Sequence, residues 1–150
     1  MAEETNAPVH VWRVDGPGPL VAYIAIGATA LKALVETLRL AHHPTVGSLE
    51  SAGLYAGLAL GAYVFMWCCV LRVRLELRAD LIVMVNPWGT QCLPWDRVAD
   101  VRLGNWGAEF ITPDGFKFTA CALSDMAGSR PQDARFEELR AAVEQLTPRA

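Results

Sequence analysis

The stretch SAGLYAGLALGAYVFMWCCVL, residues 51–71, decides the fold of this chain because it carries no charged residue. As a helix, its 21 residues are about 31 Å long, and the hydrocarbon core of a bilayer is about 30 Å thick. Tyr55 and Trp67 lie toward its two ends, where aromatic rings favour the membrane interface. The stretch therefore predicts a transmembrane helix.

The preceding segment, residues 19–41, predicts a second membrane helix. Its first 13 residues are apolar but too short to cross a bilayer alone, and the remainder brings in Lys32, Glu36 and Arg39. Two spanning helices would form a transmembrane hairpin over residues 19–71. A first helix that lies along the membrane surface is the alternative.

Lys32 and Glu36 are one helical turn apart, so their side chains can form an ion pair within the membrane segment. Ionisable residues inside a membrane are costly and often functional, which would make this pair a proton relay or a partner contact. The alternative is a structural pair whose long side chains reach toward the nearer surface. Because residues 51–71 offer no second carboxylate, the structural interpretation is favoured.

Gly53, Gly57 and Gly61 recur at every fourth position of the second helix. Such spacing forms two overlapping G-x-x-x-G steps, which allow another helix backbone to approach closely in lipid. The glycines therefore predict the packing face of this helix, against either the first helix or a partner chain.

The composition supports a membrane protein with a modest soluble domain. Hydrophobic residues make up 53% and charged residues 19% of the chain, whereas soluble domains have about 45–50% and about 25%. Of the 29 charged residues, 21 follow residue 71, which predicts a soluble domain over residues 72–150. This asymmetry argues against disorder, a secreted disulfide framework and a free cytosolic enzyme. The net charge of −3 gives no electrostatic basis for nucleic acid as a partner.

Arg72, Arg74 and Arg78 follow the uncharged span directly, as a membrane-proximal basic cluster. By the positive-inside rule, this cluster places the C-terminal domain in the cytoplasm. A hairpin then places residues 1–18 there too, as a cytoplasmic or interfacial segment with Trp12 as an anchor. The loop around residues 42–50 would lie outside. We thus expect a multi-pass protein of the plasma membrane with both termini cytoplasmic.

From residue 70 the hydrophobic period changes to two, which is typical of half-buried strands. The predicted strands cover residues 72–78, 81–86, 91–93, 101–104, 109–112 and 116–121. A helix that opens at Ser129 in capping-box form presents one apolar stripe. The stripe consists of Phe136, Leu139, Val143 and Leu146. The expected fold is a small α+β domain of five or six antiparallel strands closed by this helix.

The run Leu93-Pro94-Trp95-Asp96-Arg97-Val98, followed by the strand Val101-Arg102-Leu103, comes after two predicted membrane helices and an arginine-rich strand. In this order it resembles bacterial, actinobacterial-type membrane proteins with a PH-like domain. The resemblance covers roughly residues 70–146. It implies a partly open antiparallel β-barrel with a C-terminal capping helix, and it implies no reaction.

Trp88, Trp95 and Trp106 all lie beside predicted turns. Trp95 is expected in the core. Trp88 and Trp106 are candidates for an interaction surface, because exposed tryptophan is enriched at binding hot spots.

Sequence motifs for catalysis are absent: there is no C-x-x-C, no Gly-rich phosphate loop and no nucleophile elbow. Cys92 and Cys121 lie on different predicted strands, and a cytoplasmic domain keeps its thiols reduced. The turn at residues 79–80 is too short and too acidic for a lipid-headgroup pocket. We therefore expect no catalytic residue, no cofactor and no metal.

Two functions follow from these features. The first is a non-enzymatic, membrane-anchored PH-like module for interaction or scaffolding. The second is an accessory subunit of a larger membrane complex, bound through its transmembrane hairpin. The expected partners are membrane lipids and either a membrane protein or a second copy of the chain.

Overall fold

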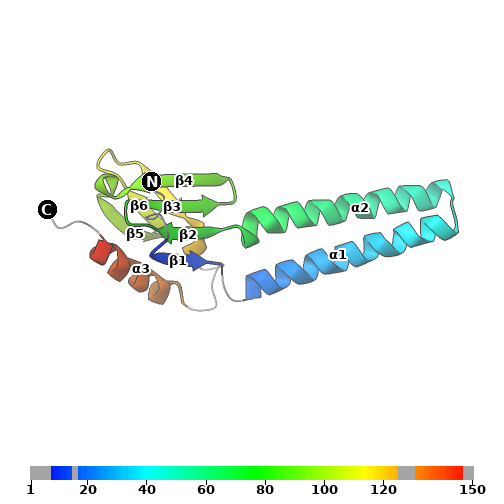
Figure 1. Cartoon of the computed structure of the whole chain (residues 1–150), viewed down its shortest axis with the longest axis horizontal. Coiled ribbons are helices and arrows are strands. Elements are labelled where there is room, and N and C mark those ends of the chain that lie inside the picture. Colours follow the sequence, from blue (N-terminus) through cyan, green and yellow to red (C-terminus); the bar gives the residue numbers. More distant parts are fainter. Residues whose placement is uncertain (1–7, 15–16, 125–130, 147–150) are drawn as a thin grey trace, which may run out of the picture.

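Two long antiparallel helices project from one end of a small β domain in the computed structural model of the chain (Figure 1). The structure describes residues 8–14, 17–124 and 131–146. Helix α1 covers Pro17–His42 and helix α2 covers Val46–Met66, continued by a π-helical turn, η1, at Trp67–Leu71. The predicted combination of a helical hairpin with a small α+β domain is confirmed.

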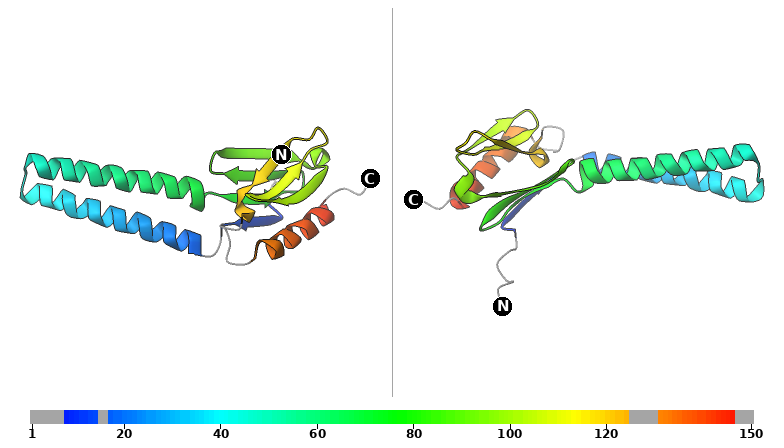
Figure 2. Two further views of the ribbon diagram at one scale, coloured as in Figure 1. Left: turned by 180° about the vertical axis from the view of Figure 1, so that it is seen from behind. Right: turned by 90° about the horizontal axis from the view of Figure 1, so that it is seen from above.

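Both helices are long and apolar enough to cross a membrane. Each has 26 residues when η1 is counted with α2, and is therefore about 39 Å long. The views of Figure 2 show the hairpin extending away from the β domain without folding back over it.

The connection between the helices is shorter than the predicted loop at residues 42–50, because α2 begins five residues before Ser51. Thr45 caps the helix: its side chain accepts a hydrogen bond from the Ser48 amide at 3.2 Å. The Ser48 hydroxyl in turn accepts a hydrogen bond from the Thr45 backbone N–H at 2.8 Å, which completes a capping box. Pro44 stands just before this cap and restricts the residue that precedes it, so α1 ends there. The predicted start of the second helix at residue 51 is therefore corrected to Val46, which the apolar pattern alone does not predict.

The β domain contains two antiparallel sheets and a C-terminal helix. The four-stranded sheet has the order β1-β2-β3-β4, with β1 at His10–Arg13, β2 at Arg74–Leu77, β3 at Leu81–Asn86 and β4 at Gly89–Pro94. The three-stranded sheet has the order β5-β6-β7, with β5 at Asp100–Gly104, β6 at Gly107–Ile111 and β7 at Lys117–Ala120. Helix α3 covers Gln132–Leu146. The capping box expected at Ser129 lies outside the described residues.

Strand β1 is the main departure from the predicted boundaries, because it comes from the segment assigned to residues 1–18. It pairs antiparallel with β2, with Arg13 opposite Arg74 and His10 opposite Leu77. Trp12 consequently packs against the core of the β domain rather than standing apart as an anchor. The two helices therefore form the connection between two adjacent strands of one sheet, and both ends of the hairpin are held by the β domain.

The hydrophobic core lies between the inner faces of the sheets and α3. Its largest members are Leu75, Leu77, Ile82, Met84, Leu93, Trp95, Phe110, Leu123 and Leu139. The register explains this set, since Leu75 opposes Met84 and Leu77 opposes Ile82, so the alternate residues of β2 and β3 share one face. Trp95 is 5% exposed, as predicted, and its indole nitrogen donates a hydrogen bond to the Arg78 carbonyl at 2.9 Å.

The predicted stripe of α3 is confirmed as its core-facing side. Leu139 and Val143 are buried, and Phe136 and Leu146 pack against the core with part of their surface exposed. Figure 1 shows α3 running alongside β1, so the helix covers the core next to the edge strand of the four-stranded sheet.

Candidate functional site

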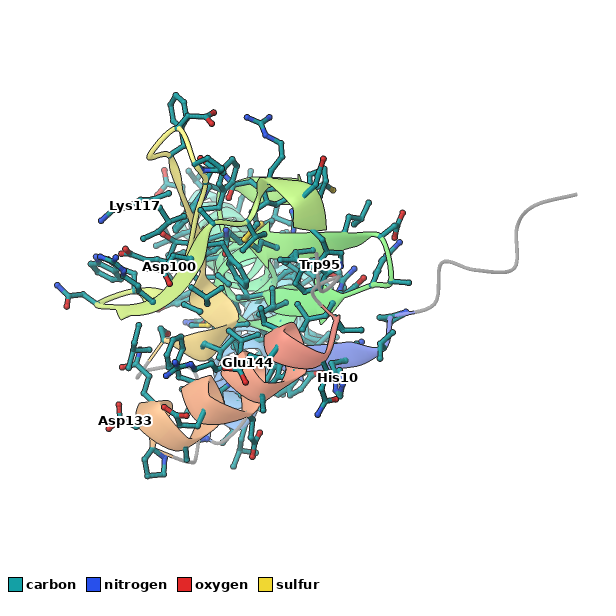
Figure 3. The ribbon with its side chains drawn as sticks, turned by 90° about the vertical axis from the view of Figure 1, so that its left-hand side faces the viewer. His10, Trp95, Asp100, Lys117, Asp133 and Glu144 are labelled. Atoms are coloured by element: carbon teal, nitrogen blue, oxygen red, sulfur yellow. The ribbon has the colours of Figure 1, made fainter. Side chains whose placement is uncertain are left out.

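A groove of about 690 Å³ runs between the edge strand β1 and helix α3. Its walls are His10, Val11, Trp12 and Arg13 from the strand and Arg135, Glu138, Ala141, Ala142 and Gln145 from the helix. Figure 3 looks onto the end of the domain away from the hairpin and shows His10 beside α3. We call this feature the β1–α3 groove.

One wall of the groove is β1, an edge strand of the four-stranded sheet among the described residues. In an antiparallel strand, alternate residues direct their backbone groups to the same side. The Arg13 carbonyl faces α3, because it accepts a hydrogen bond from the Arg135 guanidinium at 3.1 Å. An edge of this kind can accept a further strand.

Arg135 determines how α3 sits against that edge. The residue is 1% exposed, and its guanidinium also donates to the Ala122 carbonyl at 2.6 Å. Hydrogen bonds offset the cost of burying a charge, and the two carbonyls accept such bonds from Nη2 of the guanidinium. Arg135 thus joins α3, β1 and the 3₁₀ turn η3 at Cys121–Leu123.

The sequence analysis did not identify the groove or Arg135. An arginine one position before the apolar residue Phe136 is indistinguishable in sequence from any solvated charge on a helix. Strand β1 has only four residues, and the long insertion separates it from its partner strand. No local pattern could therefore have revealed this site.

Two of the three arginines in the predicted basic cluster share one carboxylate partner inside the domain. Glu76 is buried between two arginines, with Arg74 Nε at 2.6 Å and Arg78 Nη2 at 2.7 Å from its carboxylate oxygens. Hydrogen bonds from Arg74, and then from Arg78, lower the pKa of Glu76 below its usual value. Arg78 follows the end of β2 that lies away from the hairpin. Arg72 and Arg74, together with Arg13, remain at the hairpin end.

The glycine stripe does not face the first helix, contrary to one of the two predicted alternatives. Among the described residues, nothing lies within 4 Å of the position that a Cβ would take on Gly53, Gly57 or Gly61. The interface between the helices instead uses the buried Ala22 of α1 and the buried Ser48 and Ala52 of α2. The glycines form an open face on the outside of the hairpin.

The Lys32–Glu36 pair is formed, and it lies partly inside the hairpin. Lys32 Nζ is 2.5 Å from Glu36 Oε1 and lies 4.8 Å from the centroid of the Tyr55 ring of α2. Glu36 is only 4% exposed, and Arg39 Nη1 is 3.9 Å from its second carboxylate oxygen. The predicted pair therefore contributes to the contact between the helices through a cation–π interaction. Any further role stays a prediction.

The two tryptophans predicted as candidates for an interaction surface are both exposed: Trp88 is 66% exposed and Trp106 is 69% exposed. They occupy turns in different sheets: Trp88 lies between β3 and β4, and Trp106 lies between β5 and β6. The structure thus does not show them as one continuous surface.

Within the described residues, no group of three or more His, Cys, Asp or Glu side chains could hold a metal ion. Cys68, Cys69, Cys92 and Cys121 are free thiols, and burial raises the pKa of the Cys121 thiol.

Comparisons with protein families, curated proteins and solved structures give no match to this chain. The function is therefore inferred from the surfaces and contacts described above.

Proposed function

We propose that this protein is a membrane-anchored, non-enzymatic interaction module. In this proposal the hairpin spans the plasma membrane, and a PH-like domain holds a segment of a partner protein in the β1–α3 groove. The groove carries the proposal, because it combines an edge strand of a sheet with a helix wall.

A PH-like domain is supported by the layout of the β domain. Sheets of four and three antiparallel strands enclose one core, and a C-terminal helix lies along the side that the strands leave open. This layout agrees with a partly open barrel capped by a helix, which is what the resemblance in residues 70–146 implies.

Membrane insertion and a cytoplasmic β domain are supported by the hairpin and its flanking charges. Two helices of sufficient length and hydropathy leave the β domain side by side. Arg13, Arg72 and Arg74 lie at the end where the chain enters and leaves the hairpin. Positive charges at this end favour the cytoplasmic side.

The chemistry of the groove suits an extended polypeptide. A partner strand can hydrogen-bond to the free edge of β1, as in other cases of strand addition. The groove also offers apolar surface from Trp12 and Ala142 and charged groups from Arg13 and Glu138. Backbone pairing would supply affinity, and these side chains would supply specificity.

The test uses Ala141, an exposed residue that lines the groove. The Ala141→Trp variant should fill the groove and abolish co-purification of partner proteins from mild detergent, as measured by quantitative mass spectrometry. Ala134→Trp is the matched control, because Ala134 is exposed on the same helix but does not line the groove. If Ala141→Trp retains the same partners as Ala134→Trp, the groove is not the binding site.

The open glycine face favours a second candidate function, that of an accessory subunit held by its hairpin. Gly53, Gly57 and Gly61 leave a narrow face on the outside of α2 on which another membrane helix could pack. In that case the Gly57→Ile variant, rather than Ala141→Trp, would release the partners.

A further inference from the structure

The turn between β3 and β4 is a second membrane contact: we infer that Trp88 inserts its indole ring into the lipid headgroup layer beside the hairpin. This inference rests on the proposed insertion of the hairpin. It assigns one of the two exposed tryptophans to a lipid surface rather than to a protein partner.

The strand register places this turn at the level of the helix end. Three residues lead from Leu71, the end of η1, to Arg74, the start of β2. Arg74 lies opposite Val85, and three residues lead from Val85 back to Trp88. Because β2 and β3 are antiparallel, the chain runs away from the hairpin between Leu71 and Arg74 and back toward it between Val85 and Trp88. The two segments are of equal length, so Trp88 returns to about the level of Leu71. Figure 1 shows the β3–β4 turn pointing toward the hairpin, beside the end of α2.

The base of the turn is anchored to the other sheet, so the position of Trp88 is well defined. Asn86 is buried, and its amide nitrogen donates to the Thr119 carbonyl at 2.7 Å. Its amide oxygen accepts the backbone N–H of Cys121 at 3.0 Å. Asn86 pairs directly with Gly89, so only Pro87 and Trp88 extend beyond the last strand pair.

The chemistry of the exposed ring suits the headgroup layer. Indole combines a large apolar surface with one N–H donor, and tryptophan is enriched where a membrane meets water. Trp67, at the C-terminal end of α2, is 48% exposed and stacks on Tyr63 with the ring centroids 6.2 Å apart. Trp88 would extend this aromatic group at the hairpin end. The β domain would then be held by the two helices and by a third point, which limits its tilt on the membrane.

Trp106 provides the matched control. It is as exposed as Trp88 and also occupies a two-residue turn, but in the three-stranded sheet. Figure 1 shows β5 and β6 set further from the hairpin than the β3–β4 turn.

The experiment uses the full chain reconstituted in phosphatidylcholine vesicles. One set of vesicles carries a nitroxide quencher on the headgroup and another carries it at mid-chain, while iodide serves as the aqueous quencher. Subtracting the emission of Trp88→Phe, Trp106→Phe or Trp67→Phe from that of the unmodified protein isolates each tryptophan. Thermal unfolding of each variant in the same vesicles checks that it is folded.

The Trp88 emission should be quenched several-fold more strongly by the headgroup nitroxide than the Trp106 emission, and several-fold less strongly by iodide. If Trp88 responds to iodide as Trp106 does while lipid quenches Trp67, the inference is wrong and membrane insertion stands. Protection of Trp88 from both kinds of quencher would indicate a protein contact instead, and would also overturn the inference. If lipid quenches neither Trp67 nor Trp88, the proposed insertion itself fails.

Discussion

At the scale of single residues, two buried polar side chains connect elements that are distant in sequence, and a third forms ion pairs with its near neighbours. Asn86 joins β3 to β7 and η3, Arg135 joins α3 to β1, and Glu76 pairs with Arg74 of β2 and with Arg78, which follows it. Each side chain makes specific hydrogen bonds in its buried position, and such bonds offset part of the cost of removing a polar group from water. These contacts fix where the groove and the β3–β4 turn lie.

Replacing Trp95 with alanine should reduce the free energy of unfolding by about 3–5 kcal/mol, the usual cost of truncating a large buried aromatic residue. The change removes core packing and leaves the Arg78 carbonyl without its indole donor. The measurement is thermal or denaturant unfolding of the full chain in mild detergent. A fragment that begins at Arg72 is unsuitable, because it lacks β1.

Trp106→Ala is the control for this prediction, since Trp106 is exposed and should change stability little. Equal midpoints for Trp95→Ala and the unmodified chain would show that Trp95 does not belong to the core in solution.

The ion pairs of Glu76 should make stability depend on pH in the acidic range. Because the pKa of Glu76 in the folded protein lies below its ordinary value of 4.5, the ion pairs stabilise the fold fully above about this pH. Their contribution is lost as the pH falls through the lowered pKa. The difference in free energy of unfolding between the unmodified chain and Glu76→Gln should therefore shrink on acidification.

Asp100→Asn gives the matched comparison. Interaction with Arg102 also lowers the pKa of Asp100, but both side chains of this pair are exposed to water, where ion pairs contribute little. A difference between Glu76→Gln and the unmodified chain that does not change with pH would contradict the assigned role of Glu76.

At the scale of elements, the hairpin has an inner face and an outer face with different compositions. The inner face includes the buried Ala22 of α1 at the domain end of the hairpin and the buried Ser48 and Ala52 of α2 at its other end, while the glycines lie outside. Small side chains on the inner face let the helices approach closely, which supports association where lipid provides no hydrophobic driving force.

Ala52→Leu should therefore separate α1 from α2, whereas Gly53→Leu should not. The rate of crosslinking between cysteines engineered into the two helices measures their separation in vesicles. A slower rate for Ala52→Leu alone is expected, because a large side chain at Ala52 meets α1 and one at Gly53 points into open space. The opposite order would mean that the glycine face is the intramolecular one.

At the scale of the whole molecule, the hairpin is an insertion into the four-stranded sheet. Pairing between β1 and β2 holds both flanks of the hairpin together, so the described N-terminal strand and the β domain must lie on one side of any membrane that the hairpin crosses. The connection at residues 43–45 must lie on the other side.

Single cysteines in a background without Cys68, Cys69, Cys92 and Cys121 test this arrangement. On intact cells, a membrane-impermeant maleimide should label His43→Cys directly, and should label Val9→Cys and Ala99→Cys only after permeabilisation. All three positions are exposed to solvent. Labelling of Val9→Cys and Ala99→Cys from opposite sides would be incompatible with the pairing of β1 and β2. Labelling of both from outside would reverse the proposed orientation.

Local patterns in the sequence were sufficient to predict several individual helices and strands. The absence of charge over residues 51–71 predicted a membrane-type helix, and the alternation around Leu75 and Leu77 predicted β2. The predicted bounds of the strand at residues 81–86 agree with the structure, and the apolar stripe of α3 faces the core as expected. These features depend on hydrophobic periodicity, which is set by residues that are close together in the sequence.

Only the tertiary structure decided the features that depend on pairing across long separations. The register of β1 on β2 joined Arg13 to Arg74 across the whole hairpin, and it created the sheet edge of the β1–α3 groove. The packing of the two helices placed Ala22 and Ala52 on the inner face of the hairpin and left the glycines on the outside. The physical reason is the same in each case. Which atoms of distant segments meet is set by sheet register and helix packing, and neither leaves a periodic signal in the sequence.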